Sequence, residues 1–216
     1  MPLTAKPAET RIVLDNVSWK TFESLLAETG PRRGRMAYEE GTLEIMASSF
    51  EHEDLKSTLG RLVEAYAQEM GIDMKVAGST TLKLQLKQRG LEPDESYYVQ
   101  NEALVRGTTE LELGRDPPPD LAIEIQITQS GLDKLGIYAA LGVPEVWLWE
   151  GDALKIYGLD KSGKYTEQTG RMRSKALPGL PLDDLLRFLG GAREKSTTRL
   201  ANDFRAWVHE NLRKST

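Results

Sequence analysis

The stretch PPPDLAIEIQIT, residues 117–128, constrains the fold more than any other part of the chain. After the proline run, every second position is apolar: Leu121, Ile123, Ile125 and Ile127. Such strict alternation is typical of a β-strand that buries one face. Glu124 and Gln126 share the other face, where a carboxylate is ordinary in water but needs a cation or a proton if that face is also covered. The surroundings of this strand therefore decide what Glu124 can do.

Helical and strand patterns alternate along the rest of the chain. Ser18 is placed to cap a first helix that Gly30-Pro31 would end. Either Ser48 or Ser49 can cap a second helix. The predicted elements are, in chain order, a helix over 18–29, a hairpin over 33–47, a helix over 50–70, strands over 82–87, 91–99 and 121–128, a helix over 132–141, strands over 145–150, 153–158 and 164–166, and helices over 181–189 and 198–213. This order predicts a mixed α/β or α+β fold around a single sheet.

Composition restricts the chemistry more than it restricts the fold. A chain of 216 residues can bury one real core, so one domain is expected. The absence of Cys excludes disulfides, thiolate nucleophiles and Cys-based zinc sites, and two His exclude His-rich metal sites. There is no glycine-rich phosphate loop and no dinucleotide fingerprint. Carboxylate chemistry remains, and it suits hard ions such as Mg²⁺ or Mn²⁺.

The N-terminal residues MPLTAKPAET lack the apolar core of a secretion signal, and no apolar run approaches the length of a membrane span. We therefore expect a cytoplasmic protein with no membrane partner.

Charge is spread unevenly around a net value of −5. Residues 171–216 hold ten basic and five acidic residues, which makes this region +5 and leaves −10 for residues 1–170. A solvated C-terminal helix explains the basic region most simply. The alternative is a positively charged surface that binds phosphate, next to an acidic part of the protein that binds metal. The overall acidity argues against a protein that coats DNA nonspecifically.

Two carboxylates form the most informative constellation. Pro93-Asp94 precedes one predicted strand, and Glu124 and Gln126 lie on another about thirty residues later. If the two strands are neighbours, two carboxylates and an amide converge where a divalent ion could bind. The alternative is a set of surface carboxylates on a one-sided sheet. The helices over 50–70 and 132–141 carry apolar stripes that must cover a sheet, so we expect Glu124 in a pocket.

Three further residues are candidates for this pocket. Lys134 begins a helix and could reach back to the carboxylates, although a first-turn Lys is more commonly solvated. His52 lies on the apolar face of its helix, either as a satisfied core residue or as an inward-facing polar group kept neutral by the positive helix end. Glu53 lies off that face, and its role stays open.

Five segments, taken in order, closely resemble one known family: SSFEHEDLK, GSTTLK, LEPDESYYV, RDPPPDLAIEIQIT and LDKLGIYAALGVPEVWLW. They resemble the Uma-type restriction-endonuclease family of the PD-(D/E)xK nuclease superfamily. The resemblance covers roughly residues 15–190, and the run from Pro117 to Trp149 is its most specific part. It implies a restriction-endonuclease-like core with a mixed central sheet flanked by helices. Residues 1–190 would form this domain, and residues 191–216 a basic amphipathic helix, either part of the domain or an oligomerisation arm.

The same resemblance implies a metal site with Asp94 and Glu124 as ligands of Mg²⁺, or of Mn²⁺. Gln126 then occupies the position where the superfamily motif has Lys, and it carries no charge. Either Lys134 supplies the missing cation or catalysis is weak or absent. His52 and Glu53 match the family's helix positions near the site.

Three functions follow as hypotheses. The first is a metal-dependent DNA endonuclease, a phosphodiester hydrolase that could act as a homodimer. The second is a nuclease-fold protein without catalytic activity that serves as a nucleic-acid-binding or assembly module, which the acidic body and the missing Lys favour. A two-carboxylate glycosidase is a third hypothesis, weakened because no Tyr or Trp can be assigned to a sugar platform.

Overall fold

The computed structural model describes residues 9–29, 34–168 and 173–213. The strands are β1 (Thr10–Leu14), β2 (Gly34–Glu39), β3 (Thr42–Ala47), β4 (Lys75–Val76), β5 (Leu82–Leu84), β6 (Arg89–Leu91), β7 (Glu95–Tyr98), β8 (Leu121–Gln126), β9 (Glu145–Glu150), β10 (Ala153–Leu159) and β11 (Tyr165–Glu167). The helices are α1 (Trp19–Glu28), α2 (Phe50–Met70), α3 (Glu102–Val105), α4 (Lys134–Leu141), α5 (Leu182–Gly190) and α6 (Thr197–Asn211), with a 3₁₀ turn η1 (Gln85–Lys87).

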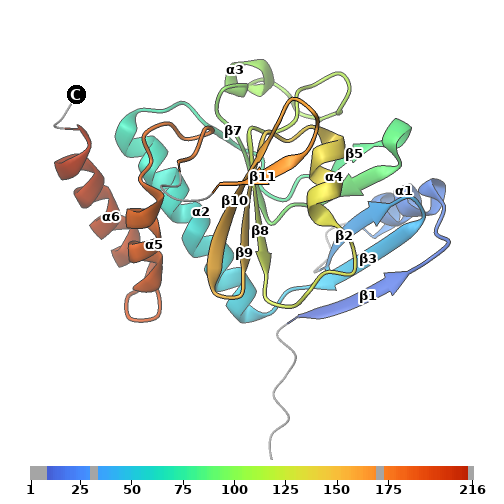
Figure 1. Cartoon of the computed structure of the whole chain (residues 1–216), viewed down its shortest axis with the longest axis horizontal. Coiled ribbons are helices and arrows are strands. Elements are labelled where there is room, and N and C mark those ends of the chain that lie inside the picture. Colours follow the sequence, from blue (N-terminus) through green and yellow to red (C-terminus); the bar gives the residue numbers. More distant parts are fainter. Residues whose placement is uncertain (1–8, 30–33, 169–172, 214–216) are drawn as a thin grey trace, which may run out of the picture.

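The strands of the described residues form two sheets, so the expectation of a single sheet is wrong (Figure 1). One sheet has the order β1-β3-β2-β6-β5, and the other has the order β11-β10-β9-β8-β7-β4. Within the second sheet only β8 and β9 are parallel. The split arises because the β2–β3 hairpin pairs with β1 and β6, and local alternation does not specify these distant partners.

Local signals place most helices as predicted. Ser18 Oγ accepts a hydrogen bond from the Thr21 amide (3.1 Å), and of the two candidate serines it is Ser49 that caps α2, through the His52 amide (3.1 Å). Gly71, at φ +67°, ends α2 in the left-handed conformation that favours glycine. The predicted helix stop at Gly30-Pro31 lies outside the described residues.

The predicted strand over 82–87 is too long. β5 stops at Leu84 because the chain turns through η1 and Gln88 (φ +49°) to pair back as β6. Leu86, expected on a buried face, is 94% exposed. In contrast, β1 was not predicted, because the sequence TRIVL does not alternate.

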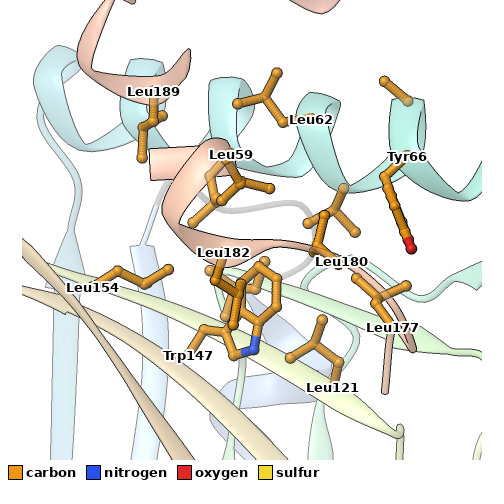
Figure 2. Packing of buried hydrophobic residues seen from close by; sticks show 14 of the residues in the cluster. Leu59, Leu62, Tyr66, Leu121, Trp147, Leu154, Leu177, Leu180, Leu182 and Leu189 are labelled. Carbon is orange, nitrogen blue, oxygen red and sulfur yellow. The ribbon is translucent and has the colours of Figure 1, made fainter. Parts of the chain in front are cut away.

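Helices cover both faces of the six-stranded sheet (Figure 1). On one face, Leu59, Leu62 and Tyr66 of α2 pack with Leu182 and Leu189 of α5 over strand residues Leu121, Trp147 and Leu154, as Figure 2 shows. α6 adds Leu200, Phe204 and Val208 to this core. On the other face, Ile137 and Tyr138 of α4 pack against Ala122 and Val146, and the five-stranded sheet contributes Ala37, Leu82 and Leu91.

Strand β8 is therefore enclosed on both sides. Leu121, Ile123 and Ile125 face α2, while Ala122 and Glu124 face α4. Glu124 is only 2% exposed, which confirms the expectation that it lies in a covered pocket. No helix of the described residues is both long and apolar enough to span a bilayer.

Candidate active site

The two predicted carboxylates meet where β7 and β8 pair. Asp94 directly precedes β7, and the antiparallel register places Glu95 opposite Ile123. Asp94 Oδ2 accepts a hydrogen bond from the Ile125 amide (2.7 Å), next to Glu124 in the chain. Both carboxylates are almost completely buried, at 0% and 2% exposure. The expected adjacency of the strands that carry them is confirmed.

Helix α4 supplies the partners of Glu124. Lys134 Nζ lies 2.6 Å from Glu124 Oε2, and the Tyr138 hydroxyl donates to Glu124 Oε1. Lys134 and Tyr138 are four residues apart, so they share one face of the helix. Burial lowers the pKa of Lys134, but the charges of Glu124 and Asp94 raise it above its ordinary value. The buried helix start thus places a protonated amine on the carboxylate pair.

His52 and Arg35 hold the other oxygen of Asp94. His52 Nε2 lies 2.9 Å from Asp94 Oδ1, and Arg35 Nη1 lies 3.1 Å from the same oxygen. The second ring nitrogen of His52, Nδ1, lies 2.7 Å from Glu9 Oε1.

Of the two alternatives for His52, the buried residue with satisfied ring nitrogens is observed, and the neutral imidazole is not supported. Burial lowers the pKa of His52, but hydrogen bonds to Asp94 and Glu9 outweigh burial and raise it to about 9. Two carboxylates on the two ring nitrogens favour the imidazolium more strongly than the helix N-terminus opposes it.

The pKa values of the two central carboxylates shift in opposite directions. Burial raises the pKa of Glu124, and the neighbouring charge of Asp94 adds to this effect against the opposing Lys134. Burial also opposes the ionisation of Asp94, but the hydrogen bond from His52 and the nearby cations hold its pKa below its ordinary value. Such a split is expected of two carboxylates that share a dry site.

Gln126 and Glu53 are engaged outside the carboxylate pair. Gln126 Nε2 donates to Glu150 Oε1 (2.9 Å) on the neighbouring strand, so the predicted convergence of this amide with the carboxylates is not observed. Glu53, with a side chain 41% exposed, accepts from Arg35 Nη2 (3.2 Å). The side chain of Glu53 is therefore linked to Asp94 through Arg35.

Comparisons with known proteins identify the family and the fold. A family model described as "Uma2: Putative restriction endonuclease" matches residues 19–186. The chain belongs to the Uma2 family. The fold is similar to the crystal structure titled "putative nuclease belonging to DUF820 from Anabaena variabilis ATCC 29413", with a TM-score of 0.50 and 16% identity over 71% of this chain and 90% of that chain. No curated protein sequence matches the chain.

The predicted resemblance and the mixed α+β, restriction-endonuclease-like fold are confirmed by these matches. The Uma2 match contains Asp94, Glu124, Lys134 and His52. Glu9 precedes it, as does all of β1.

Three residues of the site escaped the sequence predictions. Tyr138 could have been found, because it lies four positions after Lys134 on the same helical face. Arg35 stands at the start of a predicted hairpin, where an arginine carries no particular signal. Glu9 reaches His52 because β1 pairs with β3, and no local sequence pattern predicts this pairing.

Asp94 and Glu124 suit a divalent cation in kind. Among the described residues no group of three or more His, Asp or Glu side chains is arranged to hold a metal ion. Two carboxylates are nevertheless sufficient for Mg²⁺, which commonly keeps several waters and takes one or two carboxylates from the protein. Each carboxylate oxygen can accept more than one partner, so Lys134 and Tyr138 leave capacity on Glu124. The repulsion that raises the pKa of Glu124 is the kind that a cation relieves.

Proposed function

We propose that this protein is a metal-dependent DNA endonuclease that hydrolyses phosphodiester bonds at Asp94 and Glu124. Membership of the Uma2 family and the fold support a nuclease. The observation that carries the proposal is the 2.6 Å contact between Lys134 Nζ and Glu124 Oε2 beside the buried Asp94. It answers the main objection to activity, the uncharged Gln126 at the motif's Lys position.

Asp94 and Glu124 would hold the cation, Mg²⁺ or Mn²⁺. When bound, the cation supplies positive charge that offsets the phosphate and lowers the pKa of the attacking water. The protein prepares this place by fixing both carboxylates: the Ile125 amide and His52 orient Asp94, and Tyr138 orients Glu124.

Lys134 takes the role that the motif gives to Lys at the position of Gln126. Its side chain keeps 11% exposure, and its amine lies 2.6 Å from Glu124 Oε2, where it would offset the charge of an incoming phosphate. Its raised pKa keeps it protonated, which suits a group that orients water and offsets charge and does not suit a general base. Gln126, bound to Glu150, is not required for this step.

Cleavage of supercoiled plasmid and of single-stranded DNA tests the proposal. We expect nicking with Mg²⁺ or Mn²⁺, none in EDTA, and none with Asp94→Asn. Lys134→Met should lose activity, whereas the matched control Lys155→Met should keep it, because Lys155 pairs with Glu150 away from the carboxylates (2.7 Å).

Purified wild-type protein that binds Mn²⁺ and DNA but cuts neither substrate would contradict the proposal and support the binding-module alternative. If Lys134→Met and Lys155→Met were equally active, the protein would still be a nuclease, but Lys134 would have no role in its active site.

A further inference from the structure

Glu9 lies immediately before β1 and outside the segment that matches the Uma2 family. Its side chain is completely buried. Glu9 Oε1 faces His52 Nδ1 (2.7 Å), and Glu9 Oε2 accepts from the Thr128 amide (3.0 Å) and from Arg11 Nη2 (2.8 Å). A residue from the five-stranded sheet thus reaches the end of β8 and the start of α2 together.

A second buried carboxylate on the same sheet makes a related set of contacts. Glu44, on β3 beside β1, accepts from Arg11 Nη1 (2.6 Å) and from the Gly131 amide (2.7 Å). Both carboxylates therefore bind Arg11, and both accept hydrogen bonds from the segment between β8 and α4. Only Glu9 also contacts His52, and His52 in turn contacts Asp94.

We propose that Glu9 is a positioning residue that acts through His52 to fix Asp94 for metal binding. Glu9 on Nδ1 fixes the tautomer and the orientation of the buried imidazole, so that Nε2 faces Asp94 Oδ1. Outer partners of this kind orient a ligand without touching the metal. The contacts to Arg11 and Thr128 hold Glu9 itself in place.

Calorimetric titration of Mn²⁺ into the intact protein, without DNA, tests this role. Glu9→Gln should weaken Mn²⁺ binding about 10- to 100-fold. Glu44→Gln is the matched control, because it loses the same Arg11 partner and grips the same segment but has no contact with His52. We expect its Mn²⁺ affinity to stay close to that of the wild type.

A double-variant cycle asks whether Glu9 acts through His52. In a His52→Gln background, Glu9→Gln should weaken Mn²⁺ binding no further, since the connection is already cut. The ring ¹⁵N shifts of His52, readable because the chain has only two His, should change in Glu9→Gln and not in Glu44→Gln. Glu9→Asp, which keeps the charge near Arg11 but withdraws it from His52, should lose affinity in the same direction and serves if Glu9→Gln does not fold.

Equal Mn²⁺ affinities of the Glu9 and Glu44 variants would overturn this inference, as would additive losses in the cycle. The inference rests on the proposed metal site, but its readout is binding. If the wild type binds Mn²⁺ without cutting DNA, the proposed endonuclease activity is contradicted. The titration then still decides whether Glu9 positions Asp94 for metal binding. A wild type that binds no Mn²⁺ overturns both.

Discussion

Glu124 on β8 and Glu145 on the neighbouring strand β9 are equally buried, at 2% and 1% exposure, but their partners differ completely. Within the described residues, Glu145 accepts hydrogen bonds from neutral donors alone: Trp147 Nε1 (2.7 Å), Ser174 Oγ (2.6 Å) and the amides of Lys175 (2.7 Å) and Ala176 (3.3 Å). Glu124 is held by Lys134 and Tyr138, with the second carboxylate, Asp94, beside it.

The difference supports the proposal that Glu145 serves the fold and that Glu124 serves the reaction. Fixed neutral donors saturate Glu145 and anchor the segment before α5 to the sheet, so its charge serves the fold. The surroundings of Glu124 contain a side-chain cation and a second carboxylate that repels it, and a divalent ion would relieve this repulsion. Burial alone therefore does not identify a catalytic carboxylate, whereas the nature of its partners does.

The largest expected effect is on cleavage. Glu124→Gln should reduce the rate of Mn²⁺-dependent plasmid nicking by about 10²–10³-fold, because the site loses charge where the substrate charge is offset. Glu145→Gln should retain most of the activity of the folded enzyme. If both variants lose activity equally while remaining folded, the distinction between the two residues is wrong.

For the free energy of unfolding we expect the opposite order, with a larger effect at Glu145 than at Glu124. Glu145→Ala leaves three buried donors and the partly buried Lys175 amide without their acceptor and should lower the free energy of unfolding by about 3 kcal/mol. The double variant Glu124→Gln/Lys134→Met removes both members of a buried ion pair and should change this free energy by less than about 1 kcal/mol, or increase it. Urea unfolding in EDTA measures both values. A double variant less stable than Glu145→Ala would contradict the view that Glu145 contributes more to stability than Glu124.

The His52 network adds a pH dependence of stability. The folded-state pKa of His52 is raised from 6.5 to about 9. Its contribution to stability is therefore complete below pH 6.5 and is lost as the pH rises through about 9. In EDTA, the free energy of unfolding should fall by about 3 kcal/mol over this range, since each tenfold change in proton affinity corresponds to about 1.4 kcal/mol. His52→Gln should remove the fall and His209→Gln should keep it; a fall that persists in His52→Gln contradicts this assignment.

The smallest effect is expected at Gln126. Gln126→Lys restores the superfamily residue at that position, but the new amine would pair with Glu150 on β9, as Gln126 does now. If Lys134 provides the cation as proposed, the nicking rate should therefore change little. A large gain in rate would show that the missing Lys limits catalysis and that Lys134 does not replace it.

Local sequence signals predicted the parts of the site that lie on regular elements. The alternation in residues 121–127 placed Glu124, and the helix start after it placed Lys134 within reach. Pro93-Asp94 marked the second carboxylate. These positions follow from periodicity and capping, which depend on a few neighbouring residues.

The remaining parts depend on pairing between distant segments. Glu9 and Arg35 come to the site only because β1, β2 and β3 form a second sheet, and no local pattern distinguishes two sheets from one. The protonation of His52 could not be predicted for the same reason, since Glu9, its second carboxylate, arrives with β1. Gln126 was expected to join the carboxylates, but the parallel register with β9 places Glu150 beside it.

Mn²⁺ binding by the wild type, Glu124→Gln and Glu145→Gln tests the central claim most directly. If Asp94 and Glu124 form a metal site, calorimetric titration of the folded proteins will show a binding isotherm in the wild type and in Glu145→Gln that is lost in Glu124→Gln. Binding that persists unchanged in Glu124→Gln, or that disappears equally in both variants, would contradict the assignment of Glu124 as the functional carboxylate.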